Sequence, residues 1–267
     1  MYRAAVIQMT SSDEVTSNLK RAQQFIAQAA STGVKLIVLP ENFACMPAVN
    51  TQLIEIAEVY SDGPIQTFLQ QQAQQYNVWL VGGTLPLLAT EHKVTASCLM
   101  FDPHGVCVAR YDKMHLFDVQ VAGGESYCES AVFVAGDQSV WVDTPLGRIG
   151  LSVCYDLRFP TLFRKLALQG CDVIACPAAF TQTTGAAHWQ VLVRARAIEN
   201  LCYVLAANQT GEHAGQRQTY GHSFVVEPWG DIIANCDVQP GIAMGDIDLA
   251  RLQTLRDQFP CLQHERE

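Results

Sequence analysis

Short apolar runs alternate along the chain with longer segments in which hydrophobic residues recur every three or four positions. In the N-terminal third, the apolar runs at 4–9, 34–39 and 78–83 predict β-strands. The segments between them, near 14–30 and 64–75, have the period of amphipathic helices. The expected order is therefore strand, helix, strand, helix, strand, which is typical of α/β proteins.

A hairpin follows this unit, and the second half of the chain repeats the whole arrangement. Residues 33–40, Gly-Val-Lys-Leu-Ile-Val-Leu-Pro, correspond to Gly-Cys-Asp-Val-Ile-Ala-Cys-Pro at 170–177. The first hairpin turns at Asp-Pro-His-Gly (102–105), and its counterpart turns at Glu-Pro-Trp-Gly (227–230). The other predicted elements are strands at 96–101, 106–111, 148–153, 172–176, 203–207, 223–226 and 231–235, and helices at 161–168 and 187–200.

A duplicated unit of strands and helices predicts an α/β fold with internal pseudo-symmetry. Each half would supply a mixed sheet covered by helices on one face, and two such sheets can pack face to face. We therefore expect a four-layer α-β-β-α sandwich of two mixed sheets, built as a single domain over residues 1–267. No low-complexity or Pro/Ser-rich linker indicates a boundary within it.

Composition and charge narrow the classes of partner. The 267 residues are 49% hydrophobic and 16% charged, as in soluble globular proteins. Seventeen Lys and Arg against 26 Asp and Glu give a net charge of −9, which argues against nucleic acid and anionic membranes as partners. We find no secretory leader, and the apolar runs are far shorter than the ~20 residues of a membrane span. The sequence predicts a cytoplasmic protein.

The ten cysteines show no Cys-x-x-Cys pair and no spacing typical of a zinc site. Most of them lie in apolar runs, as Cys98, Cys107, Cys171, Cys176 and Cys202 do. Free cysteine is among the most buried residue types, so we expect small core side chains in a reducing compartment.

Three reactive side chains follow predicted strands. Glu41 comes after the strand at 34–39, Lys113 after the hairpin strand at 106–111, and Cys154 after the strand at 148–153. Taken singly, each is more often a solvated charge or a core thiol. Ligands of α/β sheets, however, bind beyond the carboxyl ends of strands. Taken together, the three residues therefore predict one pocket.

The chemistry of these groups is that of acyl transfer through a thioester. A thiol is a weak nucleophile until a base or a cation favours its thiolate. Glu41 can accept the thiol proton and later activate water. Lys113 can stabilise both the thiolate and the oxyanion of a tetrahedral intermediate. The backbone N–H of Tyr155, directly after Cys154, can serve as a second oxyanion donor.

Three motifs contain these residues: Leu-Pro-Glu at 39–41, Tyr-Asp-Lys-x-His-Leu at 111–116 and Cys-Tyr-Asp-Leu-Arg-Phe-Pro at 154–160. Over almost the whole chain, the sequence resembles the nitrilase (carbon–nitrogen hydrolase) superfamily. The resemblance implies that Glu41 is the general base. It makes Lys113 the oxyanion stabiliser and proton donor, and Cys154 the nucleophile.

The resemblance implies further properties. The additional pocket glutamate of the family corresponds to Glu129, with Glu125 as the alternative. The residues that follow Cys154 resemble the amidase branch, which implies hydrolysis of the terminal amide of a small carboxylated substrate to acid and ammonia. Deaminated glutathione is the implied substrate and 2-oxoglutaramate the alternative. The resemblance implies no cofactor and no metal. It implies a homodimer or a higher homo-oligomer.

Other mechanisms stay open at this point. Gly-Leu-Ser-Val-Cys at 150–154 approaches the nucleophile motif of serine hydrolases, but we expect Ser152 to point into the sheet. A cysteine–histidine pair could use His115 or His188 as the base. Acyl transfer to an amine would need a second substrate pocket. A non-catalytic binding protein would have lost one of the three reactive residues, and all are present.

Two arginines are expected to be structural or solvated. Arg158 is predicted to pair with Asp156 beneath the turn that follows Cys154. The segment 211–219, rich in Gly, Gln and His, predicts a mobile loop. On that loop we expect Arg217 to be solvated rather than to contact a substrate carboxylate.

Overall fold

Two mixed β-sheets form the centre of the protein. We describe it from a computed structural model, which covers residues 1–121 and 126–266. The first sheet has the order β17-β1-β2-β3-β5-β4, with β6 paired to β5, and the second has the order β16-β15-β12-β11-β10-β9. The first sheet comprises β1 (Tyr2–Gln8), β2 (Leu36–Val38), β3 (Trp79–Val81), β4 (Leu85–Thr90), β5 (Lys93–Phe101), β6 (Cys107–Asp112) and β17 (Gly241–Ile247). The second comprises β9 (Val140–Thr144), β10 (Gly147–Leu151), β11 (Val173–Ala178), β12 (Tyr203–Asn208), β15 (Phe224–Val226) and β16 (Ile232–Asn235).

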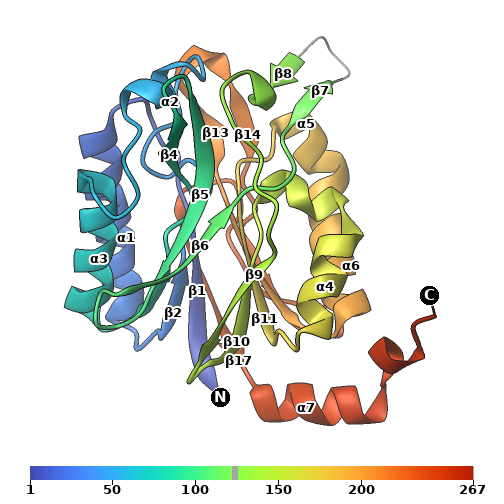
Figure 1. Ribbon diagram of the computed structural model, residues 1–267. Coiled ribbons are helices and arrows are strands. Elements are labelled where there is room, and N and C mark those ends of the chain that lie inside the picture. Colours follow the sequence, from blue (N-terminus) through green and yellow to red (C-terminus); the bar gives the residue numbers. More distant parts are fainter. Residues whose placement is uncertain (122–125, 267) are drawn as a thin grey trace.

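Helices cover the outer face of each sheet. Figure 1 shows α1 (Val15–Ala30) and α3 (Pro64–Tyr76) on one side, and α4 (Pro160–Leu168) and α6 (Gln190–Asn200) on the other. The strands therefore need apolar side chains on both faces, and they have them. Along β1, Ala4 and Val6 pack between the sheets, whereas Ala5 and Ile7 pack beneath the helices. The expected four-layer α-β-β-α sandwich is confirmed.

The internal repeat is also present in the structure. In the first sheet β1, β2 and β3 run parallel, with α1 and α3 as their connections. In the second sheet β10, β11 and β12 run parallel, with α4 and α6 as theirs. The hairpin of β5 and β6 has its counterpart in β15 and β16. The correspondence of 33–40 with 170–177 is thus that of β2 with β11.

Several elements were not predicted. Strands β4, β9 and β17 and the helix α7 (Leu249–Gln258) belong to neither copy of the predicted repeat unit. The segment 211–219, predicted as a mobile loop, instead forms much of the antiparallel pair β13 (Thr210–Glu212) and β14 (Gln218–Tyr220). The short elements are β7 (Asp118–Gln120), β8 (Ser126–Cys128), α2 (Gln52–Glu55), α5 (Gln182–Thr184), a π-helical turn (Gly185–Trp189) and the 3-10 turns at 129–131, 154–158, 214–216 and 261–264. None of the helices in the described part of the chain is long and apolar enough to span a membrane.

The strand directions decide where the reactive residues lie. Strand β6 is antiparallel to β5, which is itself antiparallel to β3, so β6 runs in the same direction as β2 and β3. The carboxyl ends of β2 and β6 therefore lie at one edge of the first sheet. The end of β10 faces them from the second sheet. This edge is the upper one in Figure 1, where the pairs β7–β8 and β13–β14 also lie.

Candidate active site

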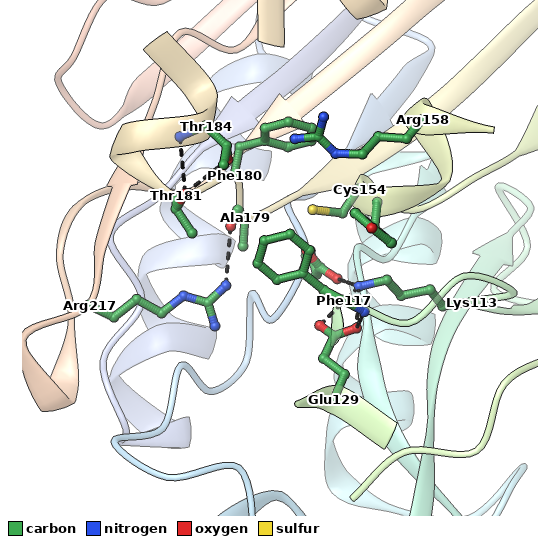
Figure 2. A pocket seen from close by; sticks show the side chains of 12 residues that line it. Lys113, Phe117, Glu129, Cys154, Arg158, Ala179, Phe180, Thr181, Thr184 and Arg217 are labelled. Atoms are coloured by element: carbon green, nitrogen blue, oxygen red, sulfur yellow. Dashed lines mark hydrogen bonds and ion pairs between the residues drawn. The ribbon is translucent and has the colours of Figure 1, made fainter. Parts of the chain in front are cut away.

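Lys113 lies between two carboxylates at the centre of the site. Its Nζ donates to Glu41 Oε1 at 2.9 Å and to the two oxygens of Glu129 at 3.0 and 2.8 Å. Lys113 is 1% exposed, and Glu41 is 3% exposed. Cys154 is buried and lines the same pocket as Glu41 and Lys113. The three residues predicted to share a pocket do share one (Figure 2).

Glu129 is the second carboxylate of the pocket. It begins a 3-10 turn directly after β8, and its Oε2 also accepts a hydrogen bond of 2.8 Å from the backbone N–H of Phe117. Glu125, the alternative suggested by the sequence, lies outside the described residues. The geometry therefore supports Glu129 as the second carboxylate that binds Lys113.

Cys154 adopts a backbone conformation that is uncommon for a residue with a side chain. Its φ is +48°, in the left-handed region, at the junction of β10 and the 3-10 turn. The carboxylate of Asp156 holds this turn, because it accepts hydrogen bonds from Val153 N at 2.8 Å and from the Tyr111 hydroxyl at 2.6 Å. Strained backbone of this kind persists only where its surroundings fix it. Asp156, which is fully buried, supplies that fixation.

The electrostatics of the site keep the thiol protonated. Burial and then the negative charge of Glu41 raise the pKa of the Cys154 thiol well above its ordinary value, and Lys113 offsets only part of this. Burial alone would lower the pKa of Lys113. The carboxylates of Glu129 and Glu41 outweigh that effect and hold the pKa of Lys113 well above its ordinary value. The resting site therefore contains an ammonium and a neutral thiol.

Aromatic side chains and two arginines complete the pocket. The ring of Tyr155 packs edge-on against that of Phe117, with 5.0 Å between centroids. Arg158 lies near Tyr155, with 5.7 Å between its guanidinium carbon and the ring centroid. The full lining comprises Glu41, Lys113, Phe117, Glu129, Cys154, Tyr155, Arg158, Ala179, Phe180, Thr181, Thr184 and Arg217.

The predictions for both arginines were wrong. Asp156 pairs with the ring of His115 at 2.6 Å, and no ion pair joins it to Arg158 among the residues described. Arg158 instead lines the pocket, as does Arg217. Arg217 was expected to be solvated, but the β13–β14 hairpin carries it inward, where it donates to the carbonyl of Ala179 at 3.2 Å.

The alternative catalytic residues are engaged elsewhere. Ser152 is fully buried and donates to the carbonyl of Ala175, as expected for a side chain inside the sheet. His115 is bound to Asp156 and stacks on Phe159 at 3.7 Å between centroids. His188 is exposed and contacts Arg158. None of the three lines the pocket that contains Cys154.

The role of Asp156 as the anchor of the turn was not predicted. Its position two residues after Cys154 is a signal that could have found it, because a short polar side chain there can bond back to the backbone.

Within residues 1–121 and 126–266, no group of three or more His, Cys, Asp or Glu could hold a metal ion.

The chain is similar to known proteins over nearly its whole length. The family model for carbon–nitrogen hydrolases matches residues 3–257. The chain is 44% identical over 267 residues to deaminated glutathione amidase of Synechocystis sp. (strain PCC 6803 / GT-S), covering 98% of this chain and 97% of the relative. Human omega-amidase NIT2 is 37% identical over 265 residues, covering 99% and 95%. Saccharomyces cerevisiae Nit3, described as a member of branch 10 of the nitrilase superfamily, has a TM-score of 0.88 at 32% identity, covering 97% of this chain and 94% of Nit3.

The layered fold and the pocket place the protein among α/β enzymes with a cysteine beyond the carboxyl end of a strand. More particularly, the chain belongs to the carbon–nitrogen hydrolase family. The membership of this family that the motifs at 39–41, 111–116 and 154–160 indicate is thereby confirmed.

Proposed function

We propose that this protein is an amidase that cleaves small carboxylated amides through a thioester on Cys154. The observation that carries the proposal is the convergence of Glu41, Lys113 and Cys154 in one buried pocket. The pocket is lined by a base, a cation and a nucleophile, which are the groups that acyl transfer requires.

In the first half of the reaction, Cys154 is acylated. Glu41 accepts the thiol proton while Sγ attacks the amide carbon, so the charge moves to the carbonyl oxygen. The Lys113 ammonium and the Tyr155 backbone N–H stabilise that oxyanion. When the intermediate collapses, the C–N bond breaks and the nitrogen leaves with the proton that Glu41 accepted.

In the second half, water releases the acyl group. Glu41, again a free carboxylate, accepts a proton from the water that attacks the thioester. The C–S bond breaks, the carboxylic acid departs, and the thiolate recovers its proton from Glu41. Glu129 contacts Lys113 throughout and keeps its charge in place. Each step uses protein groups and water alone.

The proposed substrate is deaminated glutathione, with 2-oxoglutaramate as the alternative. The names of the relatives support both choices. The two molecules share a 2-oxoglutaryl acyl group and differ in the leaving nitrogen. That nitrogen belongs to cysteinylglycine in the first molecule and becomes ammonia in the second. The release of ammonia expected from the sequence therefore applies to 2-oxoglutaramate, whereas deaminated glutathione would release the dipeptide. Arg158 lines the pocket and has no carboxylate partner among the described residues, which supports it as the proposed partner of the acyl carboxylate.

The test is release of acid from three substrates measured side by side: deaminated glutathione, 2-oxoglutaramate and glutamine. We expect turnover of the 2-oxo substrates in preference to glutamine, and loss of turnover in Cys154→Ala. Hydrolysis of glutamine alone would contradict the assignment of substrate. A repeat with added amine separates hydrolysis from acyl transfer, since an acyltransferase would form the new amide in preference to the acid.

We also propose that the chain acts as a homodimer or higher homo-oligomer. Four apolar side chains are exposed on one region: Val191 (69%) and Ile198 (46%) on α6, and Trp229 (56%) and Phe259 (50%) beside them. The rings of Trp229 and Phe259 contact each other, and Gly230 lies against Ile198. Exposed apolar patches of this kind mark protein interfaces. Light scattering should give at least twice the chain mass, and V191E/I198E should lower it.

The proposed compartment is the cytoplasm. All ten cysteines are free, which is typical of proteins in reducing compartments. With a net charge of −9, the chain is proposed to act on small molecules rather than on nucleic acid or membranes.

A further inference from the structure

A second cavity adjoins the pocket of Cys154. Its volume is about 680 Å³, whereas the space left beside Cys154 is about 10 Å³, enough for roughly one water molecule. We call the larger cavity the outer groove. Arg217 lines both spaces and so marks their junction. The outer groove is lined by Pro47, Ala48, Val49, Asn50, Ser126, Tyr127, Cys128, Gln182, Thr183, Gly215, Gln216, Arg217 and Gln218.

The outer groove suits an anionic peptide. Its walls carry four side-chain amides, which can donate to and accept from peptide groups. Among its described lining residues there is no Asp or Glu, and Arg217 is the one Lys or Arg. The whole chain has a net charge of −9, whereas the charged side chain in the described lining of the groove is positive.

The guanidinium of Arg217 has a donor that no described group of the protein accepts. One terminal nitrogen donates to the carbonyl of Ala179, and its guanidinium lies 5.3 Å from the centroid of the Tyr127 ring. Its Nε is buried and has no hydrogen-bond partner. A buried donor without a partner is costly, so it indicates a group that is bound during function.

We propose that the outer groove binds the amine side of the substrate, a short peptide with a free carboxylate that Arg217 helps to hold. The inference rests on the proposed function. A substrate that releases ammonia has no use for this space, whereas one that releases a dipeptide needs it. Arg158 lines the inner pocket and is the proposed partner of the acyl carboxylate, so a second arginine at the junction fits a second anionic group. The groove therefore favours deaminated glutathione over 2-oxoglutaramate.

Two substrates with the same acyl group test the proposal. Thr183, on the short helix α5, lines the outer groove but not the inner pocket. We expect Thr183→Trp to lower kcat/KM for deaminated glutathione by about tenfold or more, and to change it less than about twofold for 2-oxoglutaramate. Gln23→Trp, at an exposed position on α1, is the matched control and should change neither. An equal effect on both substrates, or none, overturns the proposal.

A second measurement uses the unaltered protein, so misfolding cannot obscure it. With 2-oxoglutaramate as acyl donor, the amine of alanylglycine attacks the thioester. The C–N bond forms, the C–S bond breaks, and the amine proton passes through Glu41 to the thiolate. We expect alanylglycine to capture several times more acyl group than alanylglycinamide, which lacks the carboxylate. Equal capture of the acyl group by the two amines would contradict the proposed binding of the carboxylate by Arg217.

The two proposals fail in different ways. If neither 2-oxo substrate is hydrolysed, or if Cys154→Ala retains turnover, the proposed function is wrong and the groove has no leaving group to bind. If both substrates are hydrolysed but Thr183→Trp does not separate them, the proposed function stands and the groove inference is wrong.

Discussion

At the scale of single residues, the site activates its thiol by proton transfer rather than by a lowered pKa. Two carboxylates surround one ammonium, so the net charge beside Cys154 is negative and the pKa of the thiol is raised. Glu41 must therefore remove the proton as the C–S bond forms. A protonated thiol at rest is also less open to adventitious oxidation than a thiolate.

Lys113→Met tests the cation of the site. The substitution keeps the length of the side chain but leaves Glu41 and Glu129 buried without a counter-charge. We expect kcat/KM to fall by about 10³-fold or more and the free energy of unfolding by roughly 3–5 kcal/mol. Steady-state kinetics and urea unfolding measure the two effects.

Lys20→Met, at an exposed position on α1, is the control and should alter neither quantity. A Lys113→Met protein that retains near-normal turnover would show that another group stabilises the oxyanion.

Whether a site residue can be predicted from the sequence depends on what brings it into the pocket. Glu41, Lys113 and Cys154 each follow the carboxyl end of a strand, and ligands of α/β folds bind beyond those ends, so the sequence alone indicates a shared pocket. Arg217 and Asp156 depend on side-chain contacts across the fold. Arg217 directly precedes β14, and no pattern in the sequence predicts the pairing of β14 with β13 that brings this segment to the pocket.

At the scale of elements, close backbone contacts fix the ends of the strands. A Cβ at Gly136 would collide with the carbonyl of Asp112, the residue before Lys113. Gly136 also donates to the carbonyl of Lys113 at 3.0 Å. The segment that follows β8 therefore holds the end of β6 in position, and the absence of a side chain at Gly136 permits it.

Gly136→Ala is expected to displace the backbone at Lys113. Because the added methyl group meets backbone rather than a flexible side chain, we expect kcat to fall by about tenfold or more, with a smaller change in KM. Gly241→Ala is the matched control, since the nearest atoms to its added Cβ are 3.9 Å away. If the two variants have equal kcat, this contact does not position Lys113.

The repeated elements could be predicted, and the elements outside the repeat could not. Strands such as β2 and β12 are continuous apolar runs because both of their faces are buried. By contrast, β17 contains two glycines, and buried and exposed residues alternate along only part of it. Its sequence is therefore a weak signal for a strand. β4 contains a proline and has three exposed residues, and α7 buries Leu252 alone.

At the scale of the whole molecule, buried thiols make the fold sensitive to alkaline pH. Burial raises the pKa of Cys176 and of Cys202 to about 12, from an ordinary value near 9. Above pH 9 the unfolded chain loses thiol protons that the folded chain keeps. The stability that these thiols contribute is thus fully present below pH 9 and is lost as the pH rises toward 12.

Urea unfolding in the presence of reductant should show this loss. We expect the free energy of unfolding to fall between pH 8 and pH 10.5, by up to about 1.4 kcal/mol per pH unit for each such thiol. Cys202→Ala should make the decline shallower, whereas Cys128→Ala, at an exposed position, should leave it unchanged. A stability that does not change with pH over this range would contradict the account.

The two halves of the molecule meet at the active site. One sheet supplies Glu41 and Lys113, and the other supplies Cys154, so the chemistry depends on their face-to-face packing. The most direct test of this account is the mass of the intact protein, quenched rapidly during turnover of 2-oxoglutaramate. We predict a transient gain of one acyl group, located by peptide mapping on Cys154 and on none of the other nine cysteines. An acyl group on a different residue, or turnover that persists in Cys154→Ala, would contradict it.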